Sequence, residues 1–291
     1  LADKEPRDLR WGYTAMHGVG WRVVRQAVRQ AGLPAPTVVP QQLDPDPDFP
    51  TVSFPNPEEP GAMDLAINLG REQDLDVVIA TDPDADRCAV ATVIDGGWRR
   101  LTGDELGVLL GDAAIRRGTP GTVACSVVSS TMLGDIAAAN GRDFVTTLTG
   151  FKWIGRVPNL AFGYEEAIGY CCDPAYVADK DGITATVEVL RLVGELRAEG
   201  QTLADRLAEL NRLYGVHATS QLAIRVDDLN LIQQGMTRLR AMPPTRLAGE
   251  PVTMRDLLVD TRGLPPTDAV ELSGPTVRVV ARPSGTEPKL K

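Results

Sequence analysis

The stretch DVVIATDPDADR, residues 76–87, joins an apolar run to a row of three aspartates closed by an arginine. Residues 77–80 have the pattern of a buried strand, and Asp82, Asp84 and Asp86 follow at alternate positions. Carboxylates this close repel one another, so we expect a positive partner. Oxygens at alternate positions of a turn can surround one cation, and Mg²⁺ prefers such hard oxygen ligands. The pattern predicts a metal site.

Two other interpretations of this loop remain open. It can be a solvated acidic turn, or the nucleophile loop of a haloacid-dehalogenase type of phosphatase, whose D-x-D ends in Thr or Val at the fifth position. Asp86 occupies that fifth position here, which favours a site made of carboxylates alone. The buried strand before the loop and Arg87 after it favour the metal site over a solvated turn.

Composition limits the function classes. The chain has 291 residues, 43% of them apolar, which predicts two or three compact soluble units. No apolar run approaches the roughly 18 residues of a membrane helix. The formal net charge of −9 argues against a general attraction to nucleic acid or anionic membranes. The four cysteines form no C-x-x-C pair, and we expect neither a zinc site nor a disulfide framework, in a reducing, cytoplasmic compartment.

Strand and helix patterns alternate along most of the chain, which predicts α/β architecture with a mostly parallel sheet. We expect two consecutive α/β domains, residues 1–100 and 101–214, and a smaller α+β domain, residues 215–291. Strands are expected at 12–16, 37–39, 76–80, 88–94, 122–128, 143–147, 217–226, 252–259 and 276–281. Helices are expected at 21–31, 61–73, 103–117 (capped by Thr102), 130–140, after Gly150, and at 180–198, 202–213 and 228–241; residues 40–60 are expected to form a loop.

Three further polar stretches are candidates for binding or catalysis. GYEEAIGY, residues 163–170, holds two glutamates that can bind vicinal sugar hydroxyls, although adjacent glutamates are also common on surfaces. RPSGTEPK, residues 282–289, offers an arginine, two hydroxyls and a glycine, a combination suited to phosphate, or is a polar loop. DKDG, residues 179–182, opens a helix: Asp179 can cap it, and Lys180 is either a solvated lysine or a proton-transfer group.

The ordered set of motifs resembles the α-D-phosphohexomutases, the phosphoglucomutase/phosphomannomutase superfamily. The matching stretches are YTAMHGVG (13–20), TDPDADR (81–87), TLTGFKWIG (147–155), GYEEAIGY (163–170), DKDG (179–182) and RPSGTEPK (282–289). They span nearly the whole chain, and their order is far more specific than any one of them. The resemblance implies that the three expected units correspond to the family's second, third and fourth domains, with mixed sheets in the two α/β domains and a phosphate-binding last domain.

The resemblance also implies roles for individual residues. The family's Mg²⁺ loop matches Asp82, Asp84 and Asp86, with Arg87 beside it as a catalytic group, and its proton-transfer lysine matches Lys180. The substrate-binding residues it implies lie in three loops: Thr149 and Gly150; Glu165 and Glu166; and Arg282, Ser284, Gly285 and Thr286.

The implied activity is the Mg²⁺-dependent interconversion of hexose 1-phosphate and hexose 6-phosphate, of mannose or glucose, through a phosphoserine and a bisphosphorylated sugar. Two departures stand out. Ala167 replaces the Ser or Thr that the family's sugar loop often has, and no serine lies in a T-A-S-H-N-P-like loop such as carries the family's catalytic serine. The chain begins without Met and stops just after a motif, so we expect a fragment that lacks the catalytic-serine domain and is inactive alone.

Two functional alternatives stay open: a non-catalytic protein that binds sugar phosphates, and phosphopentomutase activity on the same fold. The partners implied are hexose phosphates and a hexose bisphosphate, with no nucleic acid and no membrane. The motifs bind features that mannose, glucose and pentose phosphates share, so they do not separate these substrates.

Overall fold

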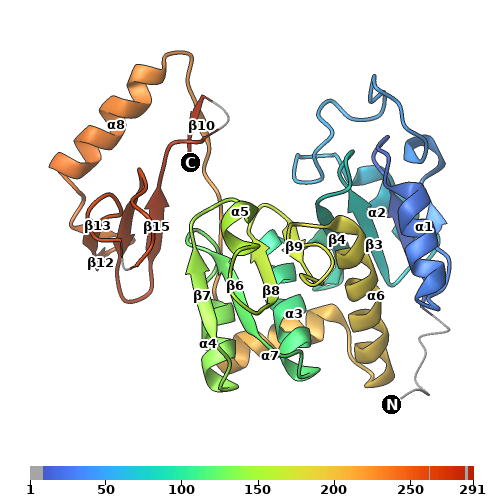
Figure 1. Cartoon of the computed structure of the whole chain (residues 1–291). Helices are drawn as coiled ribbons and strands as arrows, with labels where there is room; N and C mark the ends of the chain where they lie inside the picture. Colours follow the sequence, from blue (N-terminus) through green and yellow to red (C-terminus); the bar gives the residue numbers. More distant parts are fainter. Residues whose placement is uncertain (1–8, 262, 286–287) are drawn as a thin grey trace. The chain divides into compact units, whose positions relative to one another are not determined.

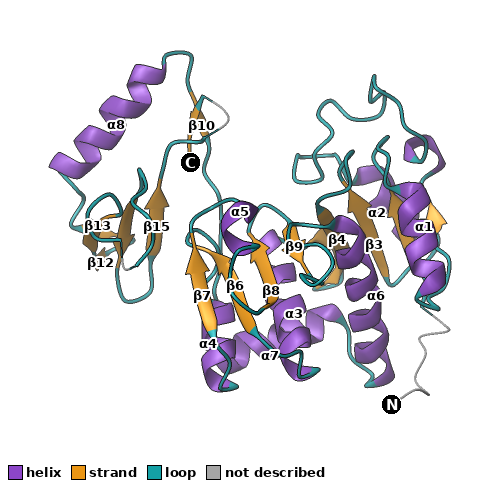
Figure 2. Cartoon of the chain, viewed as in Figure 1, coloured by secondary structure: helices purple, strands orange, loops and turns teal. Residues whose placement is uncertain are grey.

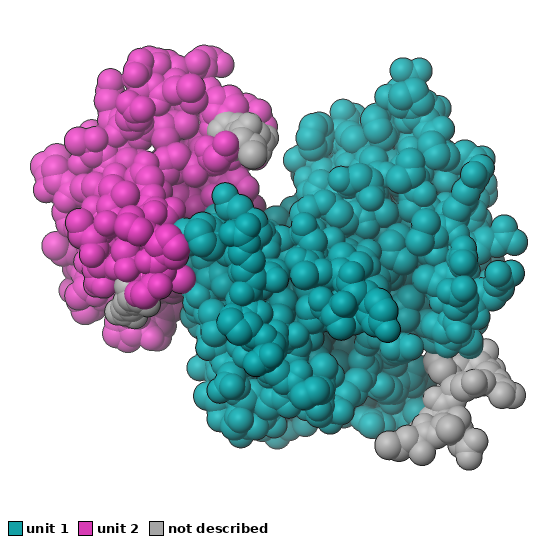
Figure 3. Space-filling model, viewed as in Figure 1, with its two compact units in different colours: residues 1–217 teal, residues 218–291 magenta. Residues whose placement is uncertain are grey.

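The structure is a computed structural model that describes residues 9–261, 263–285 and 288–291. It divides into two compact units, residues 1–217 and residues 218–291 (Figure 3). Unit 1 has the α/β character that the alternating patterns predict, and unit 2 is the smaller α+β part (Figure 2). No helix in the described ranges combines the length and the apolarity needed to cross a membrane.

The first sheet of unit 1 has five strands in the order β2-β1-β3-β4-β5; β3 and β4 are labelled in Figure 1. β1 pairs in parallel with β2 and β3, whereas β3-β4 and β4-β5 are antiparallel, so the sheet is mixed, as the resemblance implies, and is not the mostly parallel sheet that the alternation predicts. The strands are β1 (Trp11–Thr14), β2 (Thr37–Val38), β3 (Val77–Thr81), β4 (Cys88–Ile94) and β5 (Gly97–Arg100).

The second sheet of unit 1 has four strands in the order β7-β6-β8-β9 and is also mixed, because only its β8-β9 pair is antiparallel. Its strands are β6 (Thr122–Ser126), β7 (Phe144–Thr147), β8 (Leu160–Glu165) and β9 (Gly169–Cys171). Residues 163–170, expected to be one loop, are therefore mostly strand. Phe162 and Tyr164 are buried in β8, and the glutamates lie at its end, which leaves a short turn at residues 166–168.

The helices of unit 1 pack on these sheets and bury a large apolar core, beside a smaller separate cluster that includes Phe151 and Ile154 of the short helix after Gly150. Helix α6 contacts strands of both sheets, so the regions expected as domains 1–100 and 101–214 share one compact unit (Figure 1). The helices are α1 (Trp21–Gln30), the 3₁₀ turn η1 (Pro40–Gln42), α2 (Asp64–Glu72), α3 (Gly103–Arg116), α4 (Met132–Ala139), α5 (Phe151–Ile154), α6 (Gly182–Ala198) and α7 (Leu203–Tyr214).

Helix caps follow the sequence at one site, Thr102, and differ from it at another, Asp179. Thr102 caps α3 in a capping box with Glu105, as predicted. The cap of α6 is Asp181, whose carboxylate accepts from the N–H groups of Ile183 and Thr184, and not Asp179. The expectation for Asp179 was wrong because the first helical residue is Gly182, three positions later. Thr131 stands at the cap position of α4 but its side chain makes no capping hydrogen bond.

Unit 2 contains a three-stranded antiparallel sheet, β13-β14-β15, with helix α8 packed on it, and two short antiparallel strand pairs. Its elements are β10 (Ile224–Arg225), α8 (Leu229–Ala241), β11 (Arg246–Leu247), β12 (Glu250–Pro251), β13 (Thr253–Asp256), β14 (Val270–Ser273), β15 (Arg278–Ala281) and β16 (Lys289–Leu290). The long strand expected at 217–226 was wrong: only Ile224–Arg225 is strand, paired with β16, and residues 218–225 are exposed, so their alternation buries no face.

Candidate functional site

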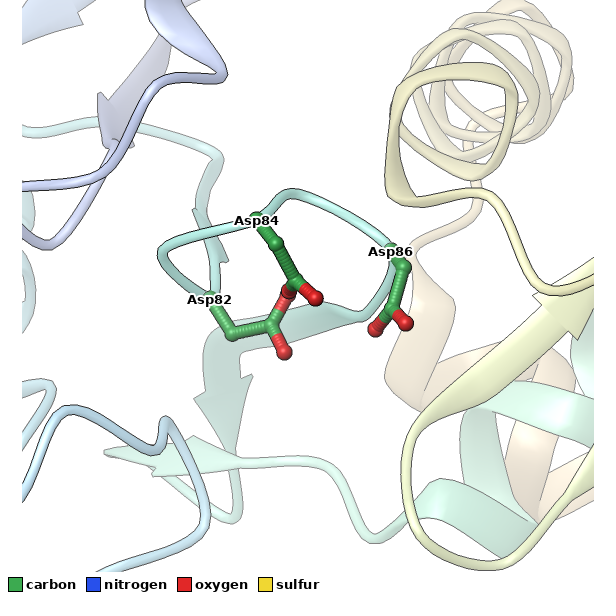
Figure 4. Close-up of side chains that lie close together, drawn as sticks. All are labelled: Asp82, Asp84 and Asp86. Carbon is green, nitrogen blue, oxygen red and sulfur yellow. The ribbon is translucent and has the colours of Figure 1, made fainter.

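The three aspartates lie on the loop between β3 and β4 of the first sheet. Their carboxylates turn toward the inside of this loop (Figure 4), and oxygens of Asp82, Asp84 and Asp86 lie within 4.8 Å of one another. Ala85, between the last two, has a φ of +61°, which reverses the chain and brings Asp86 back toward Asp82. Hard carboxylate oxygens at this spacing fit a divalent cation such as Mg²⁺.

Asp82 is the most buried of the three aspartates. Its side chain is 1% exposed, and it accepts hydrogen bonds from the Arg87 backbone N–H (2.9 Å) and from Arg87 Nε (2.5 Å). Burial raises the pKa of Asp82, and the Arg87 charge opposes that rise. Arg87 Nε also lies 3.7 Å from Asp86 Oδ1, so the arginine supplies part of the positive charge that the aspartate row requires.

Lys180 supplies a second positive charge. Its ammonium group contacts Asp86 Oδ2, so the DKDG stretch and the aspartate loop meet in the fold. The backbone brings them together, because the Gly182 N–H donates to the Ala85 carbonyl over 3.0 Å. A Cβ atom at Gly182 would lie 2.4 Å from the Arg87 carbonyl oxygen, so only glycine allows this approach.

The YTAMHGVG stretch braces the other side of the aspartate loop. The Val19 N–H donates to the Pro83 carbonyl over 2.8 Å. A Cβ atom at Gly18 would lie 2.2 Å from Pro83 Cα, so the two backbones are in direct contact. The sequence matched this motif to the family without assigning it a role. In the structure it positions the loop that carries the metal-ligand candidates.

The two glutamates at the end of β8 are both hydrogen-bonded within unit 1. The Gly150 N–H donates to Glu165 Oε1, which joins two of the predicted substrate-binding loops. Glu166 Oε2 accepts from the hydroxyls of Ser126 (3.1 Å) and Ser129 (3.4 Å). Sequence reasoning missed these serines as site residues. Their position at the end of the apolar strand β6 and in the turn that follows it was the available signal.

The glutamate turn adjoins the aspartate loop. The Cys88 N–H, directly after Arg87, donates to the Ile168 carbonyl over 3.1 Å, and the Asp181 N–H donates to the Tyr170 carbonyl over 2.9 Å. A Cβ atom at Gly169 would lie 3.2 Å from Cδ of Lys180. Unit 1 therefore gathers the aspartates, Arg87, Lys180, Gly150 and the two glutamates into one region.

The RPSG stretch belongs to unit 2, where it forms an antiparallel hairpin with the chain end. Arg282 and Lys291 exchange both backbone hydrogen bonds, of 3.0 and 2.9 Å, and the Ser284 N–H donates to the Lys289 carbonyl over 2.8 Å. Gly285 is exposed at its tip. Thr286, the remaining predicted phosphate-binding residue, lies outside the described residues.

A separate cavity of about 430 Å³ contains none of the predicted site residues. Its lining includes Thr119, Gly155, Asn159, Cys172 and Pro174. The aspartate loop is a better candidate site than this cavity, because three carboxylates lie there beside two positively charged side chains, those of Arg87 and Lys180.

Comparison with known proteins gives separate matches for two consecutive stretches of unit 1. Family models described as phosphoglucomutase/phosphomannomutase, alpha/beta/alpha domain II and domain III, match residues 1–93 and 102–214. A protein of Haemophilus influenzae named probable phosphomannomutase is 47% identical, over 99% of this chain and 60% of its own length. A protein of Schizosaccharomyces pombe named probable phosphoribomutase is 35% identical, over 99% of this chain and 55% of its own.

A solved structure shows the same fold. It is described as a putative phosphomannomutase from Thermus thermophilus, superposes with a TM-score of 0.71 at 24% identity, and covers 97% of this chain and 56% of its own. The chain thus spans little more than half the length of these relatives.

Proposed function

Because this chain belongs to the phosphoglucomutase/phosphomannomutase family, we propose that it is the metal- and sugar-binding part of a phosphomutase that interconverts hexose 1-phosphate and hexose 6-phosphate. The proposal rests on one observation: Lys180 contacts Asp86, which lies beside Asp82 and Asp84. A row of carboxylates next to a lysine can hold a cation and a proton donor at one phosphoryl group.

Each group has a part in the proposed reaction. Asp82, Asp84 and Asp86 hold Mg²⁺, which supplies neutralisation of the charge on the transferring phosphoryl group. Arg87 keeps Asp82 oriented and adds positive charge beside the phosphoryl oxygens. Lys180 holds a proton at Nζ for the sugar oxygen that loses or gains the phosphoryl group.

Substrate binding is divided among the other loops. Glu165 and Glu166 accept hydrogen bonds from sugar hydroxyls, and Thr149 and Gly150 flank them. Arg282, Ser284, Gly285 and Thr286 bind the phosphate that is not reacting, because an arginine fork with hydroxyl and backbone donors suits a phosphate dianion. The phosphoryl carrier is a phosphoserine. No serine of this chain has the sequence context of the family's carrier, so the proposal leaves that role to a residue outside this sequence.

Calorimetry and a turnover assay test the proposal. We expect the chain to bind glucose 1-phosphate or mannose 1-phosphate more tightly with Mg²⁺ than with a chelator, and to produce no 6-phosphate. Binding that is absent under both conditions would contradict the sugar-phosphate site. Mg²⁺-dependent turnover that survives repurification would contradict the external phosphoserine.

A second candidate is the same chemistry on pentose phosphates. The relative from S. pombe is named probable phosphoribomutase, and Ala167 offers no hydroxyl where the family's sugar loop often has one. A site with fewer hydroxyl contacts discriminates less between a hexose and a pentose. Competition between ribose 1-phosphate and glucose 1-phosphate for the chain separates the two candidates: a preference for ribose 1-phosphate supports the pentose assignment.

A further inference from the structure

Two buried serines of the second sheet meet at the end of β6. Ser126 is the last residue of that strand and is 1% exposed, and Ser129, in the following turn, is 2% exposed. Their hydroxyl oxygens lie 2.9 Å apart, and the Ser129 N–H donates to the Ser126 carbonyl over 3.0 Å. The pair is therefore a fixed element of the fold.

Both hydroxyls are directed at Glu166. Ser126 Oγ and Ser129 Oγ lie 3.1 and 3.4 Å from Glu166 Oε2, and the Glu166 backbone N–H donates to Ser129 Oγ over 3.2 Å. Each hydroxyl has one proton to donate, and its acceptor is either Glu166 Oε2 or the oxygen of the other serine. The Ser129 hydroxyl thus contacts both the backbone N–H and the side-chain carboxylate of Glu166.

The backbone of Glu166 is held on its other side by helix α3. A Cβ atom at Gly103 would lie 1.8 Å from the Glu166 carbonyl oxygen, so the helix start packs directly on the turn. The Tyr170 hydroxyl, on β9, donates to the Gly103 carbonyl over 3.3 Å. Within the described part of the chain, Glu166 Oε1 has no hydrogen-bond partner, and the side chain is only half-buried.

We propose that Ser126 and Ser129 are positioning residues that hold Glu166 Oε2, so that Oε1 is presented to one hydroxyl of the sugar phosphate. The inference rests on the proposed function. An exposed glutamate must give up side-chain freedom when it binds a ligand, whereas one already held by two buried hydroxyls has given up most of it. The serines act through Glu166 and do not themselves touch the substrate.

Amide hydrogen exchange tests the anchoring without any ligand. We expect Ser129→Ala to increase the exchange rate of the Glu166 amide, because that N–H loses its acceptor. Ser130→Ala is the matched control: Ser130 is 5% exposed in the same turn, but its hydroxyl accepts from the Met132 N–H and does not contact Glu166. Acceleration by Ser129→Ala alone supports the anchor, and equal acceleration by both overturns it.

Calorimetry with glucose 1-phosphate tests the role in binding. We expect Ser126→Ala/Ser129→Ala to weaken binding about three- to tenfold, as one or two lost hydrogen bonds do. In a Glu166→Ala background the same pair of changes should have almost no further effect. Deoxy analogues of glucose 1-phosphate, each lacking one ring hydroxyl, provide a second test. The serine changes should not weaken the binding of the analogue that lacks the hydroxyl contacted by Glu166.

The outcomes are distinguishable. A serine effect of equal size with every analogue and in the Glu166→Ala background would mean that the serines are merely structural, and would overturn the inference. If the double variant is poorly folded, the single Ser129→Ala change gives the same comparison. No binding of glucose 1-phosphate by the wild-type chain would overturn the proposed function and the ligand part of this inference, whereas an unchanged Glu166 amide would overturn the inference alone.

Discussion

The Lys180 ammonium group contacts Asp86 Oδ2, although the two residues are 94 positions apart in the sequence. Lys180 lies just before helix α6, and Asp86 lies on the loop between β3 and β4. The side chains are about equally exposed, at 30% and 29%. Lys180 therefore competes with a cation bound by the aspartates for the Asp86 carboxylate.

We expect Lys180→Met to bind Mg²⁺ more tightly than the wild-type chain. The change removes a positive charge that competes for Asp86, and a partly exposed ion pair of this kind corresponds to about a two- to fivefold change in affinity. Calorimetric titration with Mg²⁺ measures it. Lys152→Met, at an exposed lysine on α5, is the control and should leave the affinity unchanged. Weaker binding by Lys180→Met would show that the lysine supports the site instead.

Asp84→Asn should abolish the rise in melting temperature that Mg²⁺ causes. Asp84 is the exposed member of the three, so its removal takes away a ligand with little effect on the metal-free fold. Asp82→Asn should abolish the same rise and also destabilise the metal-free chain, because it weakens the contacts with Arg87. Asp95→Asn, at an exposed turn, should respond to Mg²⁺ like wild type. A normal response in Asp84→Asn would contradict the assigned ligand set.

Gly18→Ala should destabilise unit 1 and weaken Mg²⁺ binding together. The new methyl group would lie 2.2 Å from Pro83 Cα, so the aspartate loop must move, and overpacking of this kind costs about 1–3 kcal/mol. Gly97→Ala is the matched control, since its Cβ would meet nothing closer than 3.9 Å. Urea unfolding and Mg²⁺ titration measure the two effects. Lost stability with unchanged Mg²⁺ affinity would show that the brace does not position the ligands.

Unit 2 should lose stability in acid through Glu271. Burial alone would raise the pKa of Glu271, but its ion pairs with Arg255 and Arg278 (3.1 Å) lower the pKa below the ordinary 4.5. Its contribution is therefore fully present above pH 4.5 and is lost as the pH falls through the lower folded-state pKa.

Glu271→Gln tests this. At neutral pH we expect it to cost unit 2 about 1.5–3 kcal/mol, and the difference from wild type should shrink below the ordinary glutamate pKa. All four tryptophans lie in unit 1, so amide exchange of β14 and β15 is the suitable measurement. Asp260→Asn, at an exposed carboxylate of the same unit, is the control. A difference that stays constant into acid would exclude the ionised carboxylate as its source.

Much of the fold could be predicted from local sequence. The strand before the aspartate loop, the strand at 88–94 and the Thr102 cap lie within a residue of their predicted places, because apolar runs and capping residues act over a few positions. The prediction of a strand at 217–226 was wrong because alternation alone does not show whether a neighbouring strand is present to pair with it. Strand β14 was missed, and β8 was taken for a loop because its glutamates draw attention to the turn at its end.

The three candidate metal ligands and the order of the motifs could be predicted from the sequence, since three aspartates at alternate positions are a local pattern. The residues that contact these ligands and the glutamates could not be predicted. Gly18 and Gly182 touch the aspartate loop from distant parts of the sequence, and Ser126 and Ser129 reach Glu166 from 40 and 37 positions away. Such contacts depend on which strands become neighbours in the sheets, and that is decided by packing of the whole core, because no short stretch of sequence contains both partners.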